Sequence, residues 1–304
     1  MAGCAETCSP GFATRQTQAN VARLRSVVLG ITTAGDREPG RRNSGIRGLS
    51  GWRIQWRVVD ALTYRELRTR VSEVRGGFLG VLLPPLGMLL IWMTFLSLIN
   101  IQRSGSLNIV LFLTSGIILF SIFSNVTNRS LNAINANEAL LFYRPVKPID
   151  TVIARTICET GLFTCCMFVL LIGTWIYLDQ VVMADLSLFF VTLLGASALG
   201  FSTGLIFMTA GHIVPGFSQV AAWLPRVLWF LSGVPFRYWH FPAWTQPFFT
   251  WNPLLHFIEL NRKSLSDDYF TPITSLDYPL AWVAIQTSIA LWIYTNNERR
   301  LLTL

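Results

Sequence analysis

Six apolar segments dominate the sequence and restrict the folds that it can adopt. They run over about 78–100, 108–126, 162–178, 186–210, 220–236 and 280–294. A transmembrane helix needs roughly 20 apolar residues; most segments reach that length, and the third, fifth and sixth lie near the lower bound. Charged residues make up only 13% of the chain, against about 25% in a typical soluble domain. The sequence therefore predicts an all-α integral membrane protein with six transmembrane helices, and disfavours a soluble enzyme or a disulfide-rich secreted domain.

Positive charge is concentrated at the N-terminal end of the chain. The net charge is +8, and 13 of the 24 Lys and Arg residues precede Gly76. Residues 1–50 are rich in Arg, Ser and Gly without a sustained hydrophobic period, so we expect a disordered Arg-rich tail. They lack the apolar core of a secretory signal. Residues 51–304 are then expected to form one transmembrane domain.

Residues 51–75 change character. Apolar side chains recur every three to five residues, at Trp52, Trp56, Val59, Leu62 and Leu67. Arginines occupy the other faces, which predicts a basic amphipathic helix lying in the membrane interface. The alternative is a helix packed on a soluble domain, but the sequence offers no such domain.

The distribution of Lys and Arg among the short loops predicts the orientation. With the N-terminus in the cytoplasm, the inner side holds the basic helix, four basic residues in 128–160, and Arg299 and Arg300 near the C-terminus. The outer side holds Arg103, no basic residue in 179–185, and three in 237–263. The positive-inside rule therefore places both termini in the cytoplasm.

Two connections are more than simple loops. In the stretch 128–160, Asn135 or Asn137 can cap a short helix over 138–143. Prolines then break that helix, and Asp150 or Thr151 can restart one. A cytoplasmic elbow with this much structure indicates a docking surface for a partner protein. The outer stretch 237–278 is crowded with aromatic residues and interrupted by prolines, which predicts short re-entrant or interfacial helices before the last span.

Several chemistries have no motif in this chain. The sequence contains no G-x-x-x-x-G-K-[ST] loop, no H-E-x-x-H and no C-x-x-C, so we expect no nucleotide, cofactor or metal site of those kinds. A membrane-embedded transferase would need paired acids on one side. Glu259, Asp267 and Asp268 lie close together in the sequence, but they match no catalytic pattern, so we expect no catalytic residues.

Four stretches resemble ABC-2-type permeases that export polysaccharide. DALTYRELRTRVSEVRGGFLGVLLPP (60–85) is similar to the opening motif of that family. EALLFYRPVKPIDTVIAR (138–155), LSGVPF (231–236) and NPLLHFIELNR (252–262) resemble its capsule-export branch. The resemblance covers about residues 55–300. It departs in residues 1–50, which are additional, and at Pro84, where the family tends to have an acid.

The resemblance implies a homodimeric permease that docks on a separate ATPase subunit, which binds the ATP and Mg²⁺. The dimer would export a capsular polysaccharide, lipid-linked and acidic, across the inner membrane of a Gram-negative bacterium. A periplasmic co-polymerase-type partner and an outer-membrane channel would continue the path. The alternative is a permease of the same fold for O-antigen, teichoic acid or a small drug. An interaction with nucleic acid is not expected.

Site residues follow from this resemblance as hypotheses. The charged residues of the elbow are candidates for contact with the ATPase: Glu138, Arg144, Lys147, Asp150 and Arg155. Charged pairs across an interface set its register. The alternative for Arg144 and Lys147 is that they only hold the loop inside.

A second group of residues is assigned to the substrate pathway. A charge in the middle of a span costs roughly 2.5–3.5 kcal/mol, so Arg226 in the fifth segment is expected to meet an anionic group of the glycan. The alternative is that it snorkels to the cytoplasmic surface. The other pathway candidates are Arg237, Tyr238, Trp239, Trp244 and Trp251. Their aromatic rings can stack on sugars, or they form the aromatic belt of the outer interface.

Overall fold

The computed structural model describes residues 47–72, 77–98, 107–141, 146–178, 183–273 and 275–302. The chain divides into two compact units, Met1–Ser50 and Gly51–Leu304. Apart from 47–50, the first unit lies outside the described residues, so the disordered tail stays a prediction. All regular elements among the described residues are helical, as the all-α prediction requires.

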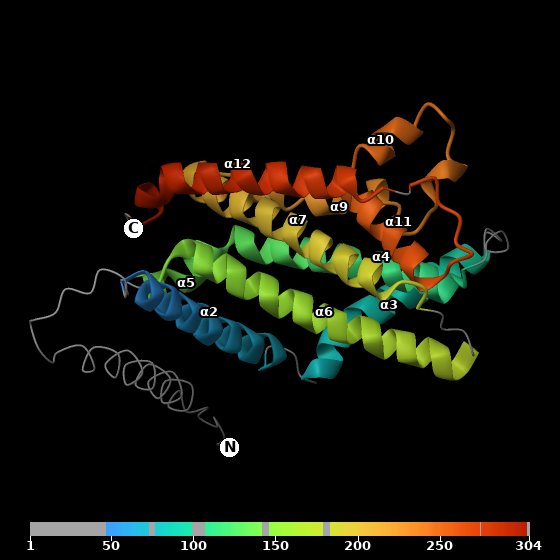
Figure 1. Ribbon diagram of the computed structural model, residues 1–304, viewed down its shortest axis with the longest axis horizontal. Helices are drawn as coiled ribbons and strands as arrows, with labels where there is room; N and C mark the ends of the chain where they lie inside the picture. Colours follow the sequence, from blue (N-terminus) through green and yellow to red (C-terminus); the bar gives the residue numbers. More distant parts are fainter. Residues whose placement is uncertain are drawn as a thin grey trace, which may run out of the picture. The chain divides into compact units, whose positions relative to one another are not determined.

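The helices follow one another along the chain. They are α2 (Arg47–Ser72), α3 (Phe78–Leu98), α4 (Ile109–Leu131), α5 (Ala133–Leu141), α6 (Pro148–Leu178), α7 (Leu186–Ile213), α8 (Phe217–Ala221), α9 (Leu224–Leu231), the 3₁₀ turn η2 (Tyr238–His240), α10 (Gln246–Thr250), α11 (Pro253–Leu265) and α12 (Asp277–Leu302). In Figure 1, α5 lies at one end of the bundle and α10 and α11 at the other. The two connections singled out in the sequence therefore lie at opposite ends.

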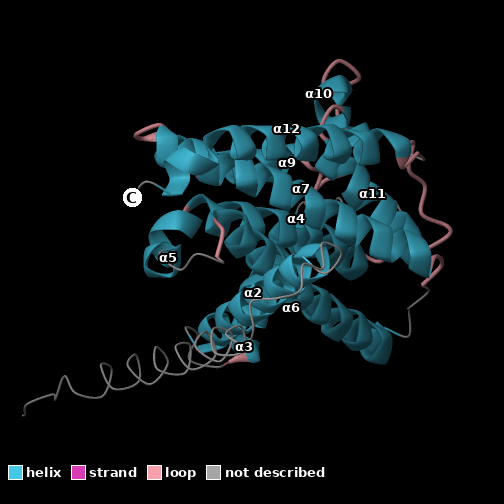
Figure 2. Cartoon of the chain, turned by 60° about the vertical axis from the view of Figure 1, so that its left-hand side comes forward, coloured by secondary structure: helices cyan, strands magenta, loops and turns pink. Residues whose placement is uncertain are grey.

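Helices α4 and α7 form the centre of the bundle. Within their apolar stretches 72% and 67% of the residues are buried, against 28% in α3 and 39% in α6. Figure 2 shows α4 and α7 between α12 on one side and α3 and α6 on the other. The outer helices therefore present much of their apolar surface outward, as a lipid-facing helix does.

Small residues allow α4 and α7 to approach closely. The row Ala196, Gly200 and Gly204 repeats every four residues on α7. A Cβ atom built on Gly200 would lie 3.3 Å from the backbone of Phe123, and one on Gly204 would lie 2.8 Å from Ser130 Cβ. A row of small residues of this kind lets the backbones of two membrane helices pack closely.

Four of the described helices are long and apolar enough to cross a membrane, namely α3, α4, α6 and α7. They contain the first four predicted segments. The third begins much earlier than predicted, because α6 starts at Pro148 rather than near 162. Its first turns carry charged residues that lower the hydropathy of the sequence, and these charges find partners on other helices.

The prediction of one continuous helix over the fifth segment, 220–236, is wrong. Helix α8 ends at Ala221, and α9 covers only Leu224–Leu231. Pro225 lies in the first turn of α9, where its missing N–H is tolerated. Gly233, with a φ of 62°, takes the left-handed conformation that ends a helix. The segment therefore forms two short helices.

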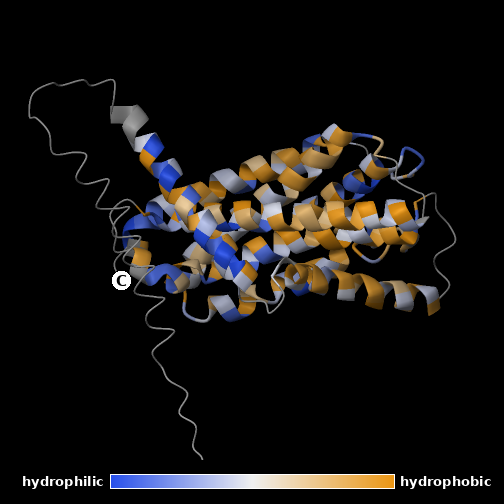
Figure 3. Cartoon of the chain, turned by 90° about the horizontal axis from the view of Figure 1, so that it is seen from below, coloured by the Kyte–Doolittle hydropathy of each residue, from blue (hydrophilic) through white to orange (hydrophobic). Residues whose placement is uncertain are grey.

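The sixth segment lies within α12, which extends past both of its predicted ends. The charges at the ends of α12 make it less apolar than the four helices above. Figure 3 shows apolar residues along most of the long helices, while hydrophilic residues gather toward the end that holds the C-terminus. That end also holds α5 (Figure 1).

Candidate functional site

The elbow begins with α5, a short helix with an internal kink. Asn137 has non-helical φ and ψ of −123° and 15°, so the chain turns near the residue expected to cap the predicted helix. Its side chain is buried, donates a hydrogen bond to Ala133 O at 2.8 Å and accepts one from Arg65 of α2. The next residue, Glu138, is exposed. Residues 142–145 lie outside the described residues, and the predicted contact residue Arg144 is among them.

The second half of the elbow is the start of α6. The Lys147 N–H donates to Asp150 Oδ2 at 2.9 Å, and the Asp150 N–H donates to Lys147 O at 3.0 Å. An acid in the first turn that binds the residue before the helix closes the helix end. Gln55 of α2 donates to the other carboxylate oxygen of Asp150. Asp150, which is only 1% exposed, therefore joins the start of α6 to α2.

Lys147, unlike Asp150, lies at the surface. Its Nζ lies 3.0 Å from Glu298 Oε1, near the end of α12, and half of its side chain is exposed. An exposed ion pair of this kind contributes little to stability. Lys147 and Glu138 are thus the described elbow candidates that present charge at the surface.

Behind the elbow lies a buried group of charges that the sequence reasoning missed. We call it the arginine–glutamate cluster. Its members come from α2, α4 and α6: Arg65, Glu66, Arg70, Arg129, Arg155 and Glu159. An acid such as Glu159 inside a long apolar helix needs a partner, and that signal was present in the sequence. No comparable signal in the local sequence indicates the contribution of α2, because the residues that pair with α2 lie far along the chain.

The cluster is built around two glutamates. Glu66 Oε1 lies 2.7 Å from Arg155 Nε and 3.5 Å from Arg129 Nη2. Glu159 Oε1 lies 3.3 Å from the Nε atoms of both Arg129 and Arg70. Glu159 is fully buried; its Oε1 makes charge contacts, and neither of its carboxylate oxygens accepts an aligned hydrogen bond. The four arginines exceed the two glutamates, so the cluster has an excess of two positive charges.

Arg155, predicted to touch an ATPase, belongs to this cluster. It is only 6% exposed, and it also donates to the backbone carbonyl of Arg129. A buried ion pair is strongly destabilised when one partner is removed. The structure therefore places Arg155 and Asp150 as supports that hold α6 against α2, behind the exposed Glu138 and Lys147. A direct contact of either with a partner stays a prediction.

At the opposite end, α11 carries a second buried ion pair. Arg262 Nη1 lies 2.7 Å from Glu259 Oε1, and both side chains are fully buried. Arg262 also donates to Val234 O at 2.8 Å and to Phe112 O at 3.3 Å. The Tyr269 hydroxyl donates to Glu259 Oε2 at 3.0 Å. These bonds join α11 to α4 and to the chain that follows α9. The spacing of the pair, three residues apart on a helix, could have indicated this contact from the sequence.

Three predicted pathway residues lie beside this pair. Arg237 lies over the rings of Phe112 and Tyr269, at 5.3 Å and 5.8 Å from their centroids. Trp239 packs against Tyr238 at 5.3 Å and against Tyr269 at 6.1 Å. Burial raises the pKa of Tyr238 to about 12, and burial together with Glu259 raises the pKa of Tyr269. Both phenols therefore stay neutral at physiological pH.

The other pathway candidates lie on different parts of the surface. Arg226 of α9 is exposed, and its guanidinium lies 4.5 Å from the ring centroid of Trp223. Trp244 is 75% exposed and Trp251 is 71% exposed. Trp251 packs edge-on against Trp282 of α12, at 5.7 Å. The structure thus brings Arg237, Tyr238 and Trp239 together, while Arg226, Trp244 and Trp251 lie outside that group.

Comparison with known proteins identifies the family. No family model matches the chain. The chain is 34% identical over 254 residues to the polysialic acid transport protein KpsM of Escherichia coli, an alignment that covers 84% of the chain and 98% of KpsM. This chain is a member of the KpsM family. It is also 29% identical over 232 residues to the capsule polysaccharide export inner-membrane protein BexB of Haemophilus influenzae, covering 74% and 85% of the two chains.

A third member of the KpsM family is the capsule polysaccharide export inner-membrane protein CtrC of Neisseria meningitidis serogroup A. It is 29% identical over 222 residues, covering 72% of this chain and 82% of CtrC. The resemblance to capsule-export permeases noted in the sequence is thereby confirmed. Membership of this family and the four apolar helices make the chain a multi-pass inner-membrane protein.

The arginine–glutamate cluster and the buried Arg262–Glu259 pair both have a structural role in this KpsM-family member. Among the residues that the structure describes, no group of three or more His, Cys, Asp and Glu side chains can hold a metal ion. Glu259 is buried with Arg262, while Asp267 and Asp268 are exposed, so these acids do not share one face. The arrangement holds helices together and leaves polar and aromatic surface at each end.

Proposed function

We propose that this chain is the permease subunit of an exporter that moves a capsular polysaccharide across the inner membrane. The observation that carries the proposal is the alignment over 98% of KpsM, which is named as a polysialic acid transport protein. Polysialic acid is anionic, so an acidic glycan is the substrate class proposed here as well. The basic residues Arg226 and Arg237 suit a pathway for an anionic chain.

The proposed arrangement has six spans with both termini in the cytoplasm. Helices α3, α4, α6 and α7 provide four, the broken pair α8–α9 the fifth and α12 the sixth. Helix α2 would lie in the membrane interface, because Trp52 and Trp56 are exposed at 64% and 53% beside the basic face. Helices α10 and α11 would form the re-entrant elements at the outer end. The homodimer implied by the family resemblance stays part of this proposal.

The energy for export is proposed to come from a separate ATPase subunit that binds the ATP and Mg²⁺. The chain has no P-loop motif, and its elbow presents Glu138 and Lys147 at the surface. These two residues, with Arg144, are the proposed contacts. Asp150 and Arg155 would hold the elbow in position through α2. Charged contacts of this kind give an interface its register.

Beyond the inner membrane, a periplasmic co-polymerase-type partner and an outer-membrane channel are proposed to continue the path. The surface proposed to face the glycan on leaving includes Trp239 and Arg237, with the buried Tyr238 packed against Trp239. Stacking of aromatic rings on sugars is one role for the exposed Trp244 and Trp251. An aromatic belt at the outer interface is the other.

Co-purification and export together test the function. The full chain, expressed in a capsulated host that lacks its own permease, should restore surface polysaccharide and copurify with a P-loop ATPase. Glu138→Arg should abolish export and weaken the copurification. Asp267→Arg, an equal change at an exposed site near the opposite end of the bundle, is the matched control and should leave both unchanged. Full export by the Glu138→Arg protein would contradict the coupling assignment, and a chain that never recruits an ATPase would contradict the function.

A further inference from the structure

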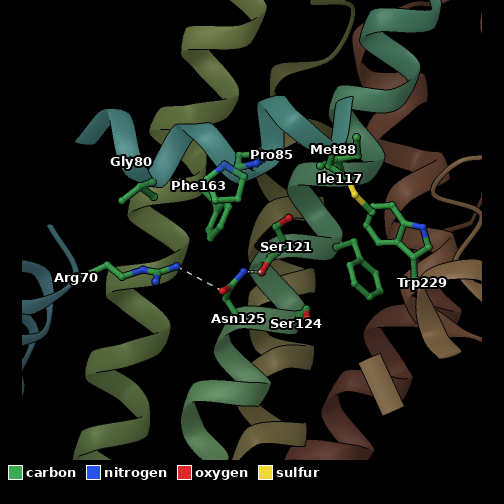
Figure 4. Close-up of a pocket in the computed structure, with 13 residues that line it drawn as sticks. Arg70, Gly80, Pro85, Met88, Ile117, Ser121, Ser124, Asn125, Phe163 and Trp229 are labelled. Atoms are coloured by element: carbon green, nitrogen blue, oxygen red, sulfur yellow. Dashed lines mark hydrogen bonds between the residues drawn. The ribbon is translucent and has the colours of Figure 1, made fainter. Parts of the chain in front are cut away.

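A cavity of about 330 Å³ lies among the helices beside the arginine–glutamate cluster. It is lined by residues of α2, α3, α4, α6 and α9, which Figure 4 shows around one space. Ser121 and Asn125 of α4 are among the residues that line it. A volume of this size accommodates a small head group and a few methylene groups.

One wall of the cavity is polar and positively charged. Arg70 reaches toward it from α2, and its Nη2 lies 3.5 Å from Asn125 Oδ1 (Figure 4). Asn125 Nδ2 donates to the backbone carbonyl of Ser121 at 2.8 Å. Arg70 belongs to the cluster with two excess positive charges, and its Nε makes only a charge contact, with Glu159. This wall therefore favours an anion.

A second wall offers hydrogen-bond acceptors from the backbone of α3. Pro84 and Pro85 lie inside that helix and have no N–H, so the carbonyls four residues earlier, on Gly80 and Val81, cannot receive their normal helical bond. Both of these residues line the cavity. Gly80 has no side chain, so it contributes backbone atoms to the wall. Carbonyls that lack their helical N–H donor and lie beside a cavity favour a ligand that carries hydroxyl or ammonium donors.

The remaining wall is apolar and aromatic, formed by Met88, Ile117, Phe120, Phe163 and Trp229. Trp229 is 9% exposed, and its Nε1 has no hydrogen-bond partner in the described part of the chain. A buried indole N–H normally has a partner, but Figure 4 shows this nitrogen on the side of the ring turned away from Arg70 and Asn125, so Trp229 contributes the apolar part of its ring to this wall. The apolar surface around it suits the first part of an acyl chain.

We propose that this cavity binds one phospholipid, with its phosphate beside Arg70 and Asn125. The hydroxyl or ammonium group of the head group would donate to the carbonyls of Gly80 and Val81. The acyl chain would pass along Phe163 and Trp229 toward the bilayer. Phosphatidylglycerol and phosphatidylethanolamine carry both features, while phosphatidylcholine has no donor and diacylglycerol has no phosphate. The proposal does not depend on which polymer the protein exports.

Native mass spectrometry of the full-length protein in detergent tests this site. We expect phosphatidylglycerol to bind in a one-to-one complex, and phosphatidylcholine and diacylglycerol to bind about tenfold more weakly, since each lacks one charge-assisted or donor contact. Arg70→Gln should weaken phosphatidylglycerol binding about tenfold. Arg68→Gln is the matched control, because Arg68 is exposed two residues away on α2 and should leave binding unchanged.

A second variant separates the cavity from the stability of the charge cluster. Ser121→Leu fills the cavity without removing an arginine or a glutamate, and it keeps the backbone carbonyl that Asn125 uses. It should abolish the one-to-one complex while the melting temperature of the protein stays within a few degrees of wild type. Equal binding of all three lipids, or undiminished binding to the Ser121→Leu protein, would overturn the proposal. The mass of the lipid that copurifies separates two sources, a plain membrane phospholipid and a phospholipid that carries an exported glycan.

Discussion

Removing Arg262 tests the reasoning about the buried ion pair of α11. Replacement by Met keeps most of the side-chain volume but deletes the guanidinium. Glu259 Oε1 then loses a partner at 2.7 Å and keeps only the hydroxyl of Tyr269 on its other oxygen. The carbonyls of Val234 and Phe112 lose their donor as well. Since the site is fully buried, water cannot replace these bonds without opening the packing of α11.

The expected loss is large. Leaving one partner of a buried ion pair uncompensated costs about 3–5 kcal/mol, and each orphaned carbonyl adds up to about 1–3 kcal/mol, with overlap between the effects. We therefore expect Arg262→Met to lower the free energy of unfolding by about 4 kcal/mol. A double variant, Arg262→Met with Glu259→Leu, removes both charges. It should be more stable than the Arg262→Met protein by about 2 kcal/mol, because no unpaired charge remains.

Reversible unfolding in mixed micelles, driven by increasing dodecyl sulfate and followed by tryptophan fluorescence, measures these differences. Lys263→Met is the matched control, because Lys263 is the next residue on the same helix and is partly exposed. We expect that change to stay within about 0.5 kcal/mol. The reasoning is refuted if the double variant is no more stable than the Arg262→Met protein, since the destabilisation would then come from lost packing rather than from a buried unpaired charge.

Three further predictions follow from other parts of the molecule. Gly204→Ala would place a Cβ 2.8 Å from that of Ser130 and should destabilise the protein by about 1–3 kcal/mol in the same unfolding assay. Gly173→Ala is the control: no neighbouring atom lies within 4 Å of its Cβ, so this change should be neutral or slightly stabilising. Burial lowers the pKa of His256 below its usual 6.5, so the unfolded chain binds the proton more readily than the folded one. Thermal stability should therefore fall as pH drops below about 6.5. A His256→Asn protein should lose that part of the pH dependence. Arg226→Leu should reduce export about tenfold at equal protein level if it meets an anionic group of the glycan, and normal export would favour the snorkelling alternative.

The apolar helices could be read from the sequence because long apolar runs leave few other folds. The segments that became α3, α4 and α7 were located within a few residues. The sequence predicts too short a third helix, because Arg155 and Glu159 interrupt the apolar run in the first turns of α6. Their partners on α2 and α4 cannot be identified from the local sequence pattern. The sequence predicts one helix over the fifth segment because its high hydropathy outweighs the helix-breaking signals of Pro225 and Gly233.

The site was predictable only where residue type was itself unusual. Aromatic crowding pointed to Tyr238 and Trp239, and the structure places them beside Arg237. The exposure of the charged elbow residues could not be predicted. Asp150 and Lys147 are both charged and lie three residues apart, yet Asp150 is buried and Lys147 is at the surface. That difference depends on Gln55, which approaches from a helix 95 residues earlier in the chain.

The arginine–glutamate cluster also has a consequence for biosynthesis. Helix α2 leaves the ribosome before every other described element, but the residues that pair with its charges, from Arg129 to Glu159, are made 63 to 89 residues after Glu66 and Arg70. Until α4 and α6 are inserted, the charged face of α2 must remain in water or against lipid head groups. The exposed tryptophans of α2 suit that waiting position. Closure of the cluster would then be a late step in assembly, so a chain whose α6 has not inserted would expose α2 to proteases and quality control.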